Sequence, residues 1–319
     1  MPPATSARSR RCTSPRTIPC RTSWSNGSSR PGSRRSAATT DPATTDPAAT
    51  ERDADPARAR RRCHAPVMRV VGIDLAASPA TTGVVVLDDG AGSWAARAIA
   101  EEADDDLLVD VVRGAGAVGV DAPLGWPDAF VAAVAAHHRF EHWSGTTDRR
   151  PMTHRRTDVV TRDIVGRYPL SVSADLLGVV AMRAALLQQR WADEVWGRRA
   201  ARDGSGPLSE TYPAAAFAAW GIACRGYKAR GRPEEARAVR GTIVRELARS
   251  TDEWLALDTI AELAVENDHV LDALVCALVA LAVVTGATTT PSAGEAEVAR
   301  REGWIHVPTS PLDRLRPPP

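Results

Sequence analysis

The sequence lacks a cysteine framework, a long hydrophobic run and a secretory signal. It has 319 residues and five cysteines, and none of the five stands in a CxxC or Cys/His ligand spacing. Neither a zinc site nor disulfides are therefore indicated, and a reducing cytoplasm is the expected location. The longest apolar stretch, 270–284, is interrupted by Asp272 and is too short to span a bilayer. We therefore expect no membrane partner and a core helix at this position.

The first 67 residues also have almost no aliphatic side chains. They consist mainly of Arg, Ser, Thr, Pro and Ala, and the segment 41–45 is repeated with one change at 46–50. Such a segment buries too little apolar surface to offset the entropy of ordering, so we expect 1–67 to be a disordered leader. Met68 stands directly before the first predicted strand. The leader is thus either a basic tail or upstream sequence read from a wrongly assigned start.

Charge is unevenly distributed along the chain. The formal net charge of +1 combines a leader with 13 arginines and five acidic residues with a body, 68–319, that has 27 Lys and Arg against 34 acidic residues. The body thus has a net charge of about −7. Proteins that bind nucleic acid non-specifically depend on Lys and Arg to neutralise phosphates, so this body is not typical of them.

The body begins with a pattern of short strands. Three β-rich runs at 70–76, 82–87 and 93–100 are separated by turn signals and predict an antiparallel meander. A helix with acidic residues in its first turn is predicted at 104–112. The uniformly apolar run 117–120 predicts a central strand, which the intervening helix makes parallel to the first.

The rest of the body is mainly helical. The expected elements are helices at 128–138, 173–196, 233–250 and 269–284, a fifth strand at 208–212, an edge strand at 303–308, and a polar, Arg-rich segment at 142–161. We expect one domain over 68–308, with a helical and loop insertion at about 128–170, and then a Pro-rich tail at 309–319. The order of elements is that of the ribonuclease H-like α/β fold. In this fold a mixed sheet of three antiparallel strands followed by parallel strands is flanked by helices.

Acidic residues stand at the ends of the predicted core elements. Asp74 lies within the apolar first strand and Asp121 ends the fourth. Burying an ionised carboxylate without a partner costs several kcal/mol, so two such strands favour a shared cation or a catalytic cleft. If the two strands are adjacent and parallel, both acids emerge at one edge. A helix crossing the sheet with its N-terminus at that edge would bring Asp272 close to both.

Two further acids are candidates for the same site. Glu210 begins the fifth strand, and Asp268 lies one helical turn before Asp272. Each acid also has an ordinary structural interpretation, as turn chemistry, a solvated strand end, or a residue that stabilises the first turn of a helix. Acidic residues clustered without cysteine favour a hard cation that binds oxygen, Mg²⁺ or Mn²⁺.

Five sequence blocks resemble those of a known family. The blocks are 71–76, 118–127, 155–158, 210–215 and 272–277, and together they are similar to the domain-of-unknown-function family 429, described as predicted nucleases of ribonuclease H-like fold. The resemblance covers nearly the whole body. It implies this fold and a metal-dependent nuclease site at Asp74, Asp121 and Asp272, with Glu210 as a fourth ligand.

The leading interpretation is hydrolysis of a phosphodiester in a nucleic acid by a metal-activated water. The catalytic candidates are Asp74, Asp121, Glu210 and Asp272, and the metal candidates are Asp74, Asp121, Asp272 and Asp268. Two basic residues, Arg156 and Lys228, are predicted to contact substrate phosphate.

Two alternatives stay open at the level of sequence. One is an ATP-binding enzyme of the actin and sugar-kinase type, which shares the strand order but normally needs two such halves and glycine-rich phosphate turns. Leu75 and Ala76 occupy the turn that would require glycine. The other alternative is a catalytically inert binding module with the ribonuclease H-like fold.

Overall fold

The computed structural model describes residues 68–89, 93–143, 148–175 and 177–318. The described residues belong to one compact unit of the chain. The predicted leader, 1–67, lies outside the described residues.

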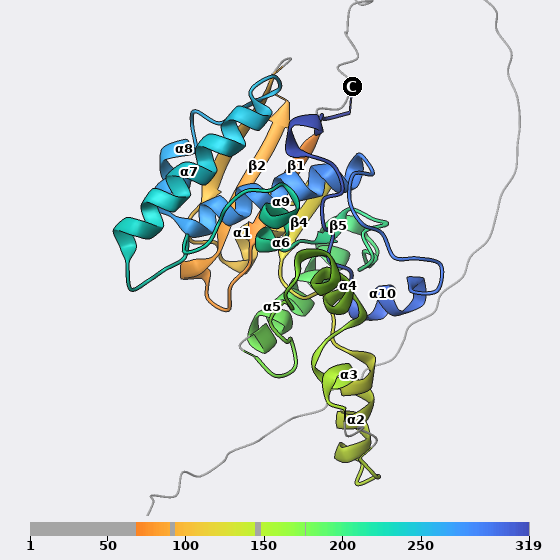
Figure 1. The fold of residues 1–319 in the computed structure, drawn as a ribbon. Coiled ribbons are helices and arrows are strands. Elements are labelled where there is room, and N and C mark those ends of the chain that lie inside the picture. Colours follow the sequence, from red (N-terminus) through yellow and green to blue (C-terminus); the bar gives the residue numbers. More distant parts are fainter. Residues whose placement is uncertain (1–67, 90–92, 144–147, 176, 319) are drawn as a thin grey trace, which may run out of the picture. The chain divides into compact units, whose positions relative to one another are not determined.

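The body is built on one six-stranded mixed sheet (Figure 1). The strands are β1 (Arg69–Asp74), β2 (Gly83–Asp89), β3 (Trp94–Ala100), β4 (Ala117–Asp121), β5 (Leu208–Glu210) and β6 (Leu255–Ala256). They lie in the order β5-β4-β1-β2-β3-β6. The first three strands form the predicted antiparallel meander, β4 is parallel to β1, and β5 is parallel to β4. This is a ribonuclease H-like arrangement, and the predicted fold class is confirmed.

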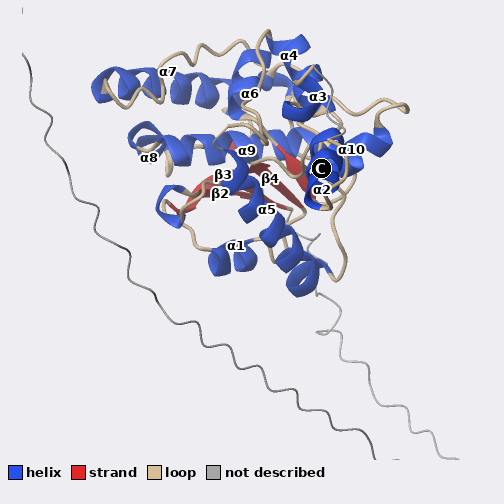
Figure 2. Cartoon of the chain, turned by 90° about the horizontal axis from the view of Figure 1, so that it is seen from below, coloured by secondary structure: helices blue, strands red, loops and turns tan. Residues whose placement is uncertain are grey.

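Helices cover both faces of this sheet. The helices of the described residues are α1 (Asp105–Val111), α2 (Asp128–His138), α3 (Arg150–Thr153), α4 (Arg156–Val165), α5 (Leu177–Trp191), α6 (Pro213–Ala219), α7 (Pro233–Thr251), α8 (Ala261–Glu266), α9 (Asp268–Val284) and α10 (Ala296–Glu302). Figure 2 shows α7, α8 and α9 on one side of the strands and α1 and α5 on the other. No helix in the described ranges is long and apolar enough to cross a membrane.

The polar segment 142–161, predicted as part of a helical and loop insertion without bounds for its helices, has defined helical structure. It contains α3 and the first part of α4. The start of α4 is held by polar contacts, because the backbone N–H of Arg155 donates to Asp158 Oδ2 over 2.8 Å and both side chains are buried. Apolar periodicity could not reveal a helix that is fixed by a buried ion pair.

The strands contribute alternate residues to two separate cores. On one face Val70, Val85 and Leu87 pack with α7, α8 and α9. On the other face Val71 and Ile73 pack with α1 and α5. Because successive strand side chains point to opposite faces, β1 serves both cores with one continuous apolar run.

Helix α9 packs directly on the backbone of the two central strands. A Cβ atom at Gly72 of β1 would lie 2.0 Å from the carbonyl oxygen of Ala273, and one at Gly119 of β4 would lie 2.3 Å from the carbonyl oxygen of Cys276. The two glycines are paired in register. At these two positions the strands thus present bare backbone to α9.

The C-terminal residues complete the body. The predicted edge strand at 303–308 forms isolated bridges, in which Ile305 pairs with Glu210 of β5 and Pro308 pairs with Thr288. In the segment predicted as a Pro-rich tail, Leu312 and Leu315 are buried in the core beneath α7 and α9. This segment therefore packs on the domain through these two leucines.

Candidate metal centre

Three acidic side chains meet where β1 and β4 end. Asp74 and Asp121 are the last residues of these parallel strands and are paired in register. Each stands two residues after a glycine that α9 covers, so each carboxylate lies on the face that α9 covers. Asp272 lies in the second turn of α9, directly before the residue that contacts Gly72. The structure brings the three together, as predicted: they offer ligand oxygens that all lie within 4.8 Å of one another.

Burial and mutual repulsion perturb these carboxylates. Asp272 is completely buried, Asp74 is 7 % exposed, and Asp121 is half-buried. Burial, followed by the charge of Asp74, raises the pKa of Asp121 well above its usual range. Burial also raises the pKa of Asp272 to about 7, although the charge of Lys228 opposes this shift. Positive charge beside Asp121 and Asp272 would favour their ionised forms.

Lys228 supplies part of that charge from the loop between α6 and α7. Its Nζ forms an ion pair with Oδ2 of Asp272. Although burial disfavours the charged lysine, attraction by the three carboxylates raises the pKa of Lys228. Tyr227, the preceding residue, donates a hydrogen bond to Asp272, with its Oη 3.1 Å from Oδ1 and 3.3 Å from Oδ2. The predicted phosphate contact therefore lies beside the predicted metal ligands.

His269 joins the site from the first turn of α9. Its Nδ1 lies 2.6 Å from Oδ2 of Asp74, and this hydrogen bond raises the pKa of His269. Asn267 caps the helix, because its Oδ1 accepts the His269 N–H over 2.9 Å. Sequence reasoning missed both His269 and Tyr227. The three-residue spacing from His269 to Asp272 places both on one helix face and could have indicated the histidine.

Glu210 lies outside the cluster of three carboxylates. Its Oε1 lies 2.6 Å from Nη2 of Arg155, and its Oε2 lies 2.8 Å from Nη1 of the same arginine. Oε2 also accepts the backbone N–H of Leu124 over 3.0 Å. Arg155 binds Asp158 as well, and all three charged side chains are buried. The structure thus gives Glu210 a buried ion pair, which the sequence analysis did not anticipate.

The remaining predicted site residues lie at the periphery. Asp268 is the first residue of α9 and is not among the three converging acids. Arg156 is half exposed, and its Nε lies 2.6 Å from Oε1 of Glu295. Their roles as metal ligand and phosphate contact stay predictions.

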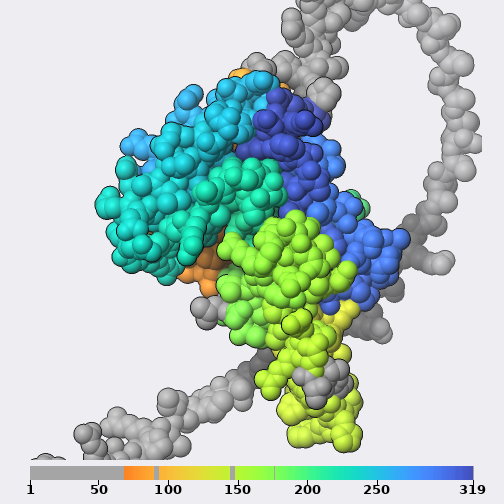
Figure 3. Space-filling view, in the orientation of Figure 1, coloured from red at the N-terminus to blue at the C-terminus, as the bar shows by residue number. Residues whose placement is uncertain are grey.

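A cavity of about 340 Å³ opens above the acids. Its polar lining includes Asp74, Asp121, Lys228 and His269, and its apolar lining includes Leu75, Pro123, Leu170, Leu177, Val180 and Tyr212. In Figure 3 the surface is hollowed between the teal and the green parts of the chain, and orange residues of the first strands are visible at the base. Asp272, which does not line the cavity, is buried behind the other acids.

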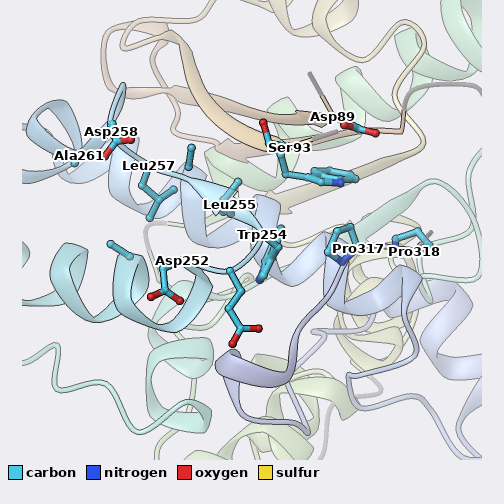
Figure 4. Close-up of a pocket in the computed structure, with 14 residues that line it drawn as sticks. Asp89, Ser93, Asp252, Trp254, Leu255, Leu257, Asp258, Ala261, Pro317 and Pro318 are labelled. Atoms are coloured by element: carbon cyan, nitrogen blue, oxygen red, sulfur yellow. The ribbon is translucent and has the colours of Figure 1, made fainter. Parts of the chain in front are cut away.

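Another cavity, of about 660 Å³, lies near β6 and the C-terminal prolines (Figure 4). Trp254, Leu255 and Pro317 line it together with the acidic residues Asp252 and Asp258. Its described lining contains no lysine, arginine or histidine and none of the three converging acids. In its described lining this cavity therefore lacks both the basic residues and the converging acids of the cavity above Asp74 and Asp121.

The donor set of the first cavity fits a hard divalent cation. Its ligand atoms are carboxylate oxygens, and no sulfur ligand is among them. Such oxygens suit Mg²⁺, Ca²⁺ and Mn²⁺. The three negative charges exceed the single positive charge of Lys228, so a divalent ion would balance the site. Fold and site together define an α/β protein with a ribonuclease H-like sheet and a carboxylate centre able to hold a divalent metal.

Comparison with known proteins assigns the family. The family model described as "Protein of unknown function (DUF429)" matches residues 72–296, well over half of the chain. The chain therefore belongs to this family, and the match contains all three converging acids. Searches of curated proteins and of solved structures found no match.

Proposed function

We propose that this protein is a metal-dependent nuclease that hydrolyses phosphodiester bonds with Mg²⁺ or Mn²⁺ bound by Asp74, Asp121 and Asp272. The observation that carries the proposal is the convergence of these acids within 4.8 Å at the ends of two paired parallel strands. The cavity above them also admits a substrate, and Lys228 beside it provides a positive charge for a phosphate.

The residues of the cavity have separate chemical roles. When bound, a divalent ion would polarise a phosphoryl oxygen and acidify a water molecule. Lys228 balances negative charge that develops on the phosphoryl group, since its ammonium lines the cavity. His269 is held by Asp74 through Nδ1, and its Nε2 has no hydrogen-bond partner among the described residues. That nitrogen is available to transfer a proton to the leaving oxygen.

Cleavage of labelled oligonucleotides tests the proposal. The full chain is incubated with Mn²⁺ and with single-stranded and double-stranded DNA and RNA, and Asp74→Asn is compared with Asp110→Asn. Asp110 is an exposed acid of α1 that does not line the cavity. We expect Asp74→Asn to lower the rate at least 100-fold and Asp110→Asn to retain it. Full activity in Asp74→Asn would remove the basis of the proposed site.

Calorimetric titration with Mn²⁺ gives a readout that does not depend on cleavage. The wild-type protein should bind the ion, and Asp74→Asn should bind it at least tenfold more weakly, because one of three ligands loses its charge. Equal affinity in the two proteins would place the ion elsewhere. A thermal shift produced by ATP, without any cleavage, would favour the kinase-like alternative instead.

A further inference from the structure

The cavity above Asp74 and Asp121 is named here the metal cavity. A more open cavity, distinct from the one near β6 and named here the second cavity, adjoins it. It has a volume of about 690 Å³ and is lined by Arg167, by residues 222–229, and by Ala214 and Ala218 of α6. Lys228 lines both cavities. The second cavity therefore lies next to the candidate metal centre, with Lys228 between the two.

Two exposed arginines, Arg167 and Arg225, line the second cavity without an ion pair inside the described ranges. Other exposed arginines of the body have a partner: Arg156 and Arg301, for example, each bind a carboxylate. Paired guanidinium groups have part of their charge neutralised. The two unpaired groups keep theirs available for an anion from outside the protein.

The charge of Arg167 acts on one residue in the lining of each cavity, Tyr212 and Cys224. Burial raises the pKa of Tyr212, which lines the metal cavity, and the charge of Arg167 opposes that shift. The same two effects, in the same order, act on Cys224, which lines the second cavity. Arg167 follows α4 and Arg225 lies between α6 and α7, so the cations come from the two segments on either side of the hollow in Figure 3.

This arrangement concentrates positive charge in a body that is otherwise acidic. The body, 68–319, has a net charge of about −7, whereas the described lining of the second cavity has Arg167, Arg225 and Lys228 and no acidic residue. Local positive charge on an acidic surface directs an anionic ligand to that place and away from the rest of the molecule.

The size of the metal cavity limits what enters it. Its volume of about 340 Å³ is near the lower end of the range for small-molecule pockets, roughly 300–1,000 Å³. It has room for a unit the size of one nucleotide, and the carboxylates lie beneath apolar walls that include Leu177 and Val180. A nucleotide within a duplex would have to be unpaired and unstacked to enter, at a cost of about a few kcal/mol.

We propose that the substrate is single-stranded nucleic acid, with one nucleotide in the metal cavity and the adjoining phosphates on Arg167 and Arg225. This inference rests on the proposed function for the scissile position and extends it to a binding track. The apolar wall of the metal cavity receives the unstacked base, and the second cavity receives the backbone.

Binding measured without cleavage tests the track. Fluorescence anisotropy in EDTA, with a labelled 12-nucleotide single strand and the matching duplex, gives affinity as a function of salt. Each phosphate contact to a single strand contributes about 0.7 to the slope of log K against log salt. Arg167→Ala/Arg225→Ala should therefore lower that slope by about 1.4 and weaken binding at least tenfold at low salt.

The matched control is Arg198→Ala/Arg199→Ala, which removes two exposed arginines that line neither cavity. It should leave the slope within about 0.3 of wild type. The arginines of residues 1–67 are present in every variant, so their contribution cancels in the comparison. The double lysine variant Arg167→Lys/Arg225→Lys should restore most of the slope, because the contacts are made to phosphate.

The outcomes separate this inference from the proposed function. An unchanged slope in Arg167→Ala/Arg225→Ala, or an equal loss on the single strand and the duplex, would overturn the track whether or not the protein cleaves. A slope reduced on the single strand alone supports the track, even if no substrate is ever cleaved with Mn²⁺ and the nuclease proposal fails. Parallel arms with DNA and RNA strands identify which sugar the track prefers.

Discussion

Replacing Gly72 with alanine should push α9 away from the sheet and separate the metal ligands. The added Cβ would lie 2.0 Å from the carbonyl oxygen of Ala273 and 2.4 Å from the backbone nitrogen of Ala277. Carbon and oxygen atoms need about 3.5 Å of separation, so α9 would have to move by more than 1 Å. Both obstructing atoms belong to helix backbone, which cannot rotate aside as a side chain can.

The expected cost follows from overpacking of a buried contact. Such changes destabilise proteins by about 1–3 kcal/mol, and for a domain of this size each kcal/mol lowers Tm by roughly 2–4 °C. We expect Gly72→Ala to lower Tm by about 5–10 °C. Because Asp272 directly precedes Ala273, the same displacement would carry its carboxylate away from Asp74 and Asp121, so Mn²⁺ affinity should fall at least tenfold.

Differential scanning calorimetry and Mn²⁺ titration of the same samples measure both effects. Gly116→Ala is the matched control, since a Cβ there would meet its nearest neighbour, the carbonyl oxygen of Arg69, at an ordinary 3.7 Å. The control should keep wild-type Mn²⁺ affinity and change Tm by no more than a few degrees. If Gly72→Ala matched it in both Tm and affinity, α9 would not be seated on bare strand backbone, and the positional argument for Asp272 would be refuted.

Three further predictions concern protons and the buried ion pair. Since burial raises the pKa of Asp272 to about 7, Mn²⁺ must displace a proton from this carboxyl at low pH. Calorimetry should therefore show Mn²⁺ affinity rising from pH 6 to 8. An affinity that does not depend on pH would contradict this expectation. Burial lowers the pKa of His306 to about 4, against about 6.5 in the unfolded chain. As pH falls from 6.5 to 4, the unfolded state takes up a proton that the folded state does not, and the free energy of unfolding should fall by about 3 kcal/mol. Urea unfolding should show a smaller fall of this free energy in His306→Gln. Glu210→Gln should cost about 3–5 kcal/mol of stability, because it leaves the buried Arg155 with one partner fewer, yet Mn²⁺ affinity in titrations at pH 7 should stay within threefold of wild type.

The candidate centre could be predicted from the sequence because its ligands end regular elements. Asp74 and Asp121 each follow an apolar run, and such runs predict buried strands. Two adjacent parallel strands end at one edge of the sheet, so strand order alone brought these acids together. Asp272 was also accessible to prediction, because the apolar helix that carries it could pack only across the sheet.

The partners of these acids were harder to predict because they depend on tertiary contacts. Tyr227 and Lys228 lie in a loop without periodic pattern, and their contact with Asp272 spans more than 40 residues of sequence. The pairing of Arg155 with Glu210 was hard to predict for the same reason, since it joins the insertion to β5. A single sequence shows that a buried charge needs a partner, but it does not show which residue supplies it.

One local pattern nevertheless links packing to chemistry. A glycine stands two residues before the acid in both strands, as Gly72 before Asp74 and as Gly119 before Asp121. A spacing of two places the glycine and the acid on one face of a strand. The glycine lets α9 approach, and the acid then meets Asp272 at the end of that approach. Because both steps use one face of one helix, a change at either glycine should act on metal binding as well as on stability, whereas a change in the core on the opposite face should act on stability alone.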